Sequence, residues 1–294
     1  MHDHSPSKIN IKYLAIALAI TITFFVVELI GSFLTNSLAL LTDAWHMLND
    51  VLALTFALIA SWVARRPVSM KKTYGYYRAE ILAAFLNGIF LWAIVAFIFY
   101  AAFQRIQNPV EVKSFEMLLI ATLGLIANGL SAFTLSKAES QSLNIKGAFL
   151  HVVADILGSV GAIFAGLIML FTGWYQVDSL ISIIIGVLIF YSSTKLIRDS
   201  LNILLEGVPF HINLEDLEKR LLQFDEIKSV HDLHVWCITT DKMCCMSGHV
   251  IVKEGIKRKE LLTRLIEMLK EDFGIDHTTI QLEEGEYPKS PSEH

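Results

Sequence analysis

Six apolar stretches, each long enough to cross a membrane, constrain this chain more than any other feature of its sequence. They lie near residues 11–34, 38–64, 79–103, 115–136, 147–173 and 176–198. About 20 apolar residues span the hydrocarbon core of a bilayer as a helix, which satisfies its own backbone hydrogen bonds there. A hydrophobic content of 54% agrees with a membrane protein. We therefore predict an α-helical membrane protein with six transmembrane helices within residues 11–204.

The charges of the short connections predict the orientation of these helices. Basic residues gather on one side, whereas only Arg105 and Lys113 lie on the other. By the positive-inside rule, both termini are then cytoplasmic. The first apolar stretch has no small-residue cleavage site, so we expect it to remain as a helix. Residues 1–10 and 288–294 are short and polar, and we expect both to be disordered tails.

Residues 205–287 have the pattern of a separate cytoplasmic domain. Helical periodicity covers 214–224, where Asn213 is a suitable cap, and 257–273, while alternation predicts strands at 230–239, 247–252 and 277–283. The order αββαβ is that of a ferredoxin-like, metallochaperone-like domain. Beyond Leu204 the chain has 18 acidic and 11 basic residues, a net charge of −7. That charge argues against nucleic acid as a partner and is compatible with cations.

Two pairs of metal-ligating residues interrupt the apolar stretches. His46 and Asp50 are four residues apart, as are His151 and Asp155, so each pair lies on one face of a helix. Each ionisable group near the bilayer centre costs roughly 2.5–3.5 kcal/mol, which makes two matched pairs informative. Together they offer a tetrahedral set of two histidines and two carboxylates, which suits Zn²⁺ better than Mg²⁺ or Ca²⁺. Asp43, one turn before His46, is positioned to orient that imidazole or to line an entry path.

Other polar residues of the apolar stretches have simpler interpretations. The alternative to a metal site is that each His/Asp pair forms an internal hydrogen bond that stabilises a helix bundle. Glu28 fits a polar contact within the bundle, with a proton-carrying role left open. Asn87 and Asn128 are candidates for interhelical hydrogen bonds. Asp178 is expected at the outer interface, where a charge costs little.

The predicted cytoplasmic domain has its own candidate ligands. His231 and His249 fall on the paired strands of one hairpin, so they can meet across it. His277 and Glu283 are six residues apart, about 20 Å along a strand, which is too far to share one ion. We therefore rank His231, His249 and Glu283 above His234 and His277. Surface histidines that bind no metal are the alternative.

The three cysteines, Cys237, Cys244 and Cys245, all fall in the predicted cytoplasmic domain. A reducing cytosol makes a structural disulfide improbable there. We expect buried strand residues, with soft metal ligation by Cys244 and Cys245 as the alternative.

Several motifs together resemble the cation diffusion facilitator family. They are the run DAWHMLNDVLAL, the segments KTYGYYRAEILAAFLNG and GAFLHVVADILGSVG, and the signatures HDLHVW and TIQLE. Both pairs begin with histidine, as in the zinc-exporting branch, which in bacteria exports zinc, cadmium and cobalt. The resemblance implies a homodimer joined through the cytoplasmic domains, with His46, Asp50, His151 and Asp155 as the transport site.

Two departures from the family pattern refine this resemblance. Tyr77 stands where zinc-type relatives usually have a histidine, which puts a metal site in that loop in doubt. The connection over residues 137–146 lacks the histidine-rich segment of many eukaryotic members. The absence of this segment favours a multi-pass protein of the bacterial inner membrane.

The resulting functional hypothesis is a secondary active transporter that exports Zn²⁺, with Cd²⁺ and Co²⁺ as alternatives, in exchange for protons. Zinc is then its substrate and a structural or regulatory ion of the cytoplasmic domain, and membrane lipid surrounds it. We expect no enzyme activity, no catalytic residues and no organic cofactor.

An intramembrane metalloenzyme is one alternative to this transporter, and it would need an open coordination position and a general base. A membrane-bound metal sensor that signals through the cytoplasmic domain is the other alternative, and no nucleotide-binding motif supports ATP coupling.

Overall fold

The structure is a computed structural model of the whole chain. It describes residues 8–64, 66–136, 143–239 and 243–285. The predicted terminal tails fall mostly on residues 1–7 and 286–294, outside the described residues. Residues 8–10, which the sequence places in the first tail, belong to a helix.

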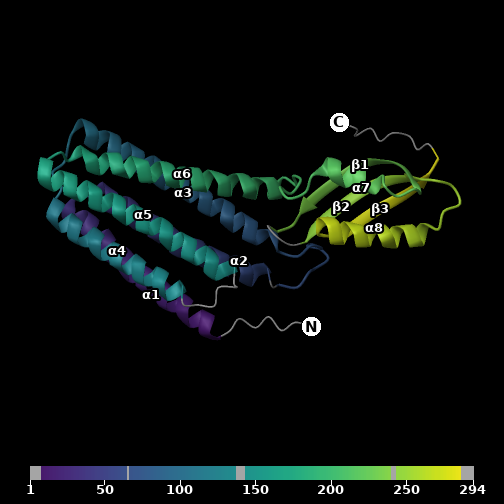
Figure 1. Cartoon of the computed structure of the whole chain (residues 1–294), viewed down its shortest axis with the longest axis horizontal. Coiled ribbons are helices and arrows are strands. Elements are labelled where there is room, and N and C mark those ends of the chain that lie inside the picture. The colour runs from purple at the N-terminus through teal and green to yellow at the C-terminus, as the bar shows by residue number, and fades with distance from the viewer. Residues whose placement is uncertain (1–7, 65, 137–142, 240–242, 286–294) are drawn as a thin grey trace. The chain divides into compact units, whose positions relative to one another are not determined.

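Six long helices come first in the chain (Figure 1). They are α1 (Lys8–Thr35), α2 (Leu38–Ala64), α3 (Arg78–Gln107), α4 (Ser114–Ser136), α5 (Leu143–Thr172) and α6 (Gln176–Leu204). Among the described residues, four segments are long and apolar enough to cross a membrane: Arg78–Gln107, Ser114–Phe133, Asp155–Thr172 and Gln176–Leu204. The described apolar part of α1, Ala19–Thr35, is shorter. The chain thus has a helical membrane domain, while the number of six spans stays a prediction.

One group of helices packs around α4, which lies against α1 and against α5 (Figure 1). Asn128 of α4 donates a hydrogen bond from Nδ2 to Oγ of Ser159 in α5, at 3.4 Å. The interhelical role predicted for this asparagine is therefore confirmed. The start of α2 joins an apolar cluster with α4 and α5, which includes Leu40, Met117 and Met169.

The helices α3 and α6 also pack together. Leu91 and Val95 of α3 form a buried cluster with Ile189 of α6, and the rings of Trp92 and Phe190 stack with centroids 5.5 Å apart. Gly186 brings the backbone of α6 close to α3, because a Cβ there would lie 2.7 Å from Cε1 of Phe99. A glycine is needed at this crossing.

Asp178 lies near the start of α6, where the outer interface is expected, and its depth in the membrane stays a prediction. Its side chain is only 1% exposed. Its carboxylate accepts hydrogen bonds from the hydroxyl of Ser37 and from the backbone N–H groups of Leu38 and Ala39. These donors replace water, and they belong to a segment 139 to 141 residues away in the chain, a contact that local sequence pattern does not reveal.

The rest of the chain forms two helices and a three-stranded sheet. The elements are α7 (Leu214–Leu221), β1 (Ile227–Cys237), β2 (Cys244–Val252), α8 (Arg258–Phe273) and β3 (Ile275–Glu284). The sheet order is β1-β2-β3, with β1 antiparallel and β3 parallel to β2. Asn213 caps α7 as predicted, since its Oδ1 accepts from the N–H of Glu215 at 2.9 Å. Gly274, with φ of +68°, ends α8 in the left-handed conformation.

Both helices bury their apolar residues against one face of this sheet. The core contains Leu217 and Leu221 of α7, Leu261, Leu265 and Leu269 of α8, and Val235, Met246 and Val250 of the strands. On β2 and β3 the core residues alternate with His249 and Glu283, which therefore face the other side. The fold leaves this second face for polar groups.

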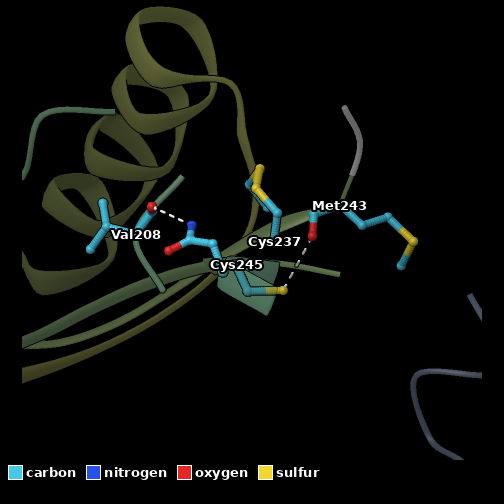
Figure 2. Close-up of a disulfide and its surroundings, with 6 residues drawn as sticks. Val208, Cys237, Met243 and Cys245 are labelled. Atoms are coloured by element: carbon cyan, nitrogen blue, oxygen red, sulfur yellow. Dashed lines mark hydrogen bonds between the residues drawn. A yellow bond between two sulfur atoms is a disulfide. The ribbon is translucent and has the colours of Figure 1, made fainter. Parts of the chain in front are cut away.

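The expectation that the cysteines form no disulfide is wrong. Cys237 at the end of β1 is bonded to Cys244 at the start of β2 (Figure 2). The two residues are register partners, and their Cα atoms lie 3.9 Å apart. Cys245 is a buried thiol whose Sγ lies 3.7 Å from the carbonyl oxygen of Met243. Burial raises the pKa of this thiol, so the structure does not favour Cys244 and Cys245 as a pair of soft metal ligands.

The apolar core of the cytoplasmic domain allows a first prediction. Leu265 is fully buried, whereas the next residue, Ile266, is 40% exposed. Leu265→Ala removes buried methyl groups and leaves a cavity, which costs about 2–5 kcal/mol. Hydrogen exchange of the β2 amides in the full-length protein should become correspondingly faster. Ile266→Ala is the matched control and should change exchange little; equal effects of both variants would contradict this core.

Candidate metal centres

The membrane helices bring one residue of each predicted pair together. Nε2 of His46 in α2 lies 3.6 Å from Oδ1 of Asp155 in α5. Asp155 is buried and His46 is about one-quarter exposed. Asp50 and His151 lie one turn along the same two helices, but their side chains are outside those that the structure describes. The set of four ligands therefore stays a prediction.

A glycine allows α2 to approach α5 beside this pair. A Cβ placed on Gly158 would lie 3.1 Å from Oδ1 of Asp43. Asp43 is buried and lies one turn before His46 on α2. Its carboxylate thus contacts the backbone surface of α5 three residues after Asp155. Whether it orients a ligand or lines a path stays a prediction.

Glu28 of α1 lies in the interior of the same group of helices. Its side chain is 1% exposed. A Cβ on Gly124 of α4 would be 2.5 Å from Oε1 of Glu28, so the carboxyl group fills the space that this glycine leaves. Oε2 has no hydrogen-bond partner among the residues that the structure describes. The position agrees with a polar group of the bundle interior and assigns Glu28 no ligand role.

The cytoplasmic sheet holds a compact cluster of three potential ligands. His231 of β1 lies directly opposite His249 of β2, and their ring centroids are 5.1 Å apart. Glu283 of β3 reaches both histidines, with Oε2 3.2 Å from Nε2 of His231 and Oε1 2.6 Å from Nδ1 of His249. One ligand atom from each residue lies within 4.8 Å of the others. These are the three residues that sequence reasoning ranked first.

A β-bulge in β1 adds a residue that sequence reasoning missed. The register advances from His231↔His249 to His234↔Ser247, so β1 has one extra residue here. Asp232 adopts a left-handed conformation with φ of +51°. Its Oδ1 lies 2.9 Å from Nε2 of His234, and its Oδ2 lies 3.9 Å from Nε2 of His249. The bulge therefore places His234 on the same face as His231, which strict alternation would not.

The remaining candidates are placed as follows. His277 lies opposite Cys245 of β2, away from the cluster of His231, His249 and Glu283. Gln281, a second residue that sequence reasoning missed, donates from Nε2 to Oε1 of Glu283 at 2.8 Å. Gln281 is two residues before Glu283 on the same strand face, and this spacing was the available signal.

Neighbouring donors hold Glu283 in its ionised form. Burial of the Glu283 carboxyl raises its pKa, but hydrogen bonds from His249, His231 and Gln281 outweigh burial and hold the pKa below its usual range. A carboxylate and two imidazoles form a donor set that fits Zn²⁺, with a fourth position left for another ligand.

A helical membrane domain in which a histidine meets a buried carboxylate, joined to a small domain with three clustered potential metal ligands, is the arrangement expected of a membrane protein that handles metal cations. Comparison with known families agrees. The profile of the "Cation efflux transmembrane domain" matches residues 14–205, and that of the "Cation efflux protein, cytoplasmic domain" matches residues 209–285. The chain belongs to the cation efflux family, the cation diffusion facilitators that its motifs resemble. Members of this family are transporters and not enzymes.

Individual relatives match over most of the chain. The metal cation efflux system protein CzcD of Cupriavidus metallidurans is 44% identical over 96% of this chain and 89% of its own length. A cadmium, cobalt and zinc/H⁺-K⁺ antiporter of Bacillus subtilis is 42% identical, over 96% and 91%. Zinc transporter ZitB of Escherichia coli is 40% identical, over 96% and 90%. A solved structure of the metal-bound C-terminal domain of CzcD is 36% identical over 24% of this chain and 99% of that chain, with a TM-score of 0.23.

The close approach of α2 and α5 gives a second prediction. Gly158→Val would overpack the contact with Asp43, a change that typically costs about 1–3 kcal/mol. We expect equilibrium Zn²⁺ binding in a His231→Ala/His249→Ala background to weaken at least about fivefold. Gly129→Val is the matched control, because a Cβ at Gly129 meets nothing within 4 Å among the described residues. Equal affinity of the two glycine variants would contradict the importance of this contact.

Proposed function

We propose that this protein is a secondary active transporter that exports Zn²⁺ from the cytosol in exchange for protons, with Cd²⁺ and Co²⁺ as alternative substrates. The observation that carries the proposal is the approach of His46 in α2 to Asp155 in α5. The names of the bacterial relatives, which include zinc, cadmium, cobalt and H⁺, support the choice of ions.

The proposed transport site consists of His46, Asp50, His151 and Asp155. The described pair fixes which faces of α2 and α5 point toward each other. Asp50 and His151 lie on those same faces, because residues four apart are neighbours on a helix. Two imidazole nitrogens and two carboxylate oxygens complete a tetrahedral Zn²⁺ shell. A cation there also offsets the cost of two carboxylates within the membrane.

Competition between metal and protons supplies the coupling. An imidazole binds Zn²⁺ only when neutral, and its pKa is ordinarily near physiological pH. A site that faces outward gains protons and releases its ion. When it faces the cytosol again, it loses those protons and binds another ion. Movement of the helices α2 and α5 relative to the others would expose the site to each side in turn.

The proposed setting follows from the helices and their loops. With six transmembrane spans, the basic connections, both termini and the sheet domain would lie on the cytoplasmic side by the positive-inside rule. The bacterial relatives support an inner-membrane location. The match to the cytoplasmic-domain profile supports a homodimer joined through that domain.

In the cytoplasmic domain, His231, His249 and Glu283 would hold a regulatory zinc ion. Asp232 and His234 lie next to it and would help to orient His249. The rise of cytosolic zinc would fill this site and bias the membrane helices toward transport. The ion is thus both substrate and regulator.

The main test is Zn²⁺ flux into proteoliposomes under an imposed pH gradient. We expect gradient-dependent uptake by the native protein, and a loss to background in Asp50→Ala and Asp155→Ala. Asp225→Ala, at an exposed acidic residue of the cytoplasmic domain, is the control and should transport normally. Zinc binding without flux under any gradient would reject the transporter and favour a metal sensor. Repeating the assay with Cd²⁺, Co²⁺ and Mn²⁺ measures selectivity.

The cytoplasmic cluster is tested by replacing His231 and His249 together with alanine. We expect activation of transport by zinc to weaken, while the membrane site still binds Zn²⁺. The control is His277→Ala, on the same sheet but outside the cluster. If the double variant keeps the native dependence of flux on zinc, the regulatory role is wrong.

A further inference from the structure

Asp178 is a buried charge that the proposed exchange of zinc and protons does not use. Its Oδ1 accepts hydrogen bonds from Oγ of Ser37 at 2.7 Å and from the N–H of Ala39 at 3.2 Å. Its Oδ2 accepts from the N–H of Leu38 at 2.6 Å. The first N–H groups of a helix have no partner within the helix, and α2 begins at Leu38. A carboxylate from α6 therefore caps the helix that carries the transport residues.

The same network holds the turn between α1 and α2. Asn36 is in the left-handed conformation with φ of +59°. Nη1 of Arg105, near the end of α3, donates to the carbonyl oxygen of Asn36 at 2.5 Å and lies 3.8 Å from Oδ2 of Asp178. The N–H of Lys113 donates to the carbonyl oxygen of Thr35 at 3.0 Å. The start of α2 is thus fixed by α3, by the connection before α4 and by α6.

This fixation bears directly on the cation site. His46 lies eight residues after Leu38, about 12 Å along a rigid helix. The depth and rotation of α2 at its first turn therefore set where His46 points. The contact of His46 with Asp155 requires a particular rotation of α2 about its axis, because successive residues of a helix point in directions about 100° apart.

We propose that Asp178 is a positioning residue for transport, which caps α2 from α6 and thereby holds His46 of α2 toward α5. This inference rests on the proposed transport function. In this proposal Asp178 does not bind the cation itself and acts only through the position of α2. Its loss should alter how well the site binds, beyond any effect on stability.

Asp178→Asn is the test variant. The amide keeps one acceptor oxygen but directs an NH₂ group at a backbone N–H, which leaves that buried donor without its partner. We expect the Zn²⁺ concentration for half-maximal flux to rise about tenfold, the scale of a lost buried hydrogen bond. The maximal rate per folded molecule should change less than about twofold, because the ligands themselves remain. Zn²⁺ binding measured in the His231→Ala/His249→Ala background should weaken in parallel.

Ser37→Ala is a milder second variant, which removes one donor to Asp178. It should shift the half-maximal concentration in the same direction, and its effect should not add to that of Asp178→Asn. Asp199→Asn, near the other end of α6, is the matched control and should behave like the native protein.

A lower melting temperature with unchanged half-maximal concentration and unchanged binding would overturn the inference and leave Asp178 a structural cap. That result, with normal native flux, leaves the proposed function intact. Absence of flux from the native protein rejects the proposed function instead, and the binding measurement then decides the inference alone. If the native membrane domain binds no Zn²⁺, both are wrong.

Discussion

Carboxylates removed from water need partners, and in this protein Asp155 and Asp178 each meet such partners on or beside a neighbouring helix. An ionised group in a low-dielectric interior is stable only with opposite charge or hydrogen-bond donors. Asp155 of α5 lies against His46 of α2, and Asp178 of α6 lies against the first N–H groups of α2. The helix α2 is therefore held at two points by acids of other helices. The polar side chains of α2, such as His46 and Asp43, therefore point in defined directions.

Small residues lie beside two other buried carboxyl groups, those of Glu28 and Asp43. Lipid tails are as apolar as leucine side chains, so helices in a bilayer associate through close packing and polar contacts. Gly124 leaves room for the carboxyl group of Glu28, and Gly158 leaves room for that of Asp43. A larger residue at either position would displace a carboxyl group from the interior. Glycine and acid together explain why α1, α2, α4 and α5 can enclose polar groups.

Much of this arrangement could be predicted from the sequence, because it follows from local pattern. Segment length indicated the membrane helices, and Asn213 caps α7 as expected. A spacing of four predicts the paired ligands, of which the structure describes the approach of His46 to Asp155. Contacts between distant segments were beyond such reasoning. The burial of Asp178 depends on donors about 140 residues away, and the Cys237–Cys244 bond depends on strand register. The bulge at Asp232 moved His234 to another face, since one extra residue reverses the alternation of a strand.

The two centres use the same kinds of ligand, yet their supports suit them to different tasks. His46 and Asp155 belong to separate helices, whose packing can change without breaking any backbone hydrogen bond. Such a site can gain and lose affinity for an ion as the helices move, and release of the ion requires a loss of affinity. His231, His249 and Glu283 belong to three hydrogen-bonded strands, so separating them would break the sheet. The donors around Glu283 hold its pKa low even without metal, and the ligands are already converged. A site of this kind would register the zinc concentration without expelling its ion by rearrangement, and this difference supports the proposal that the helices carry out transport and the sheet regulates it.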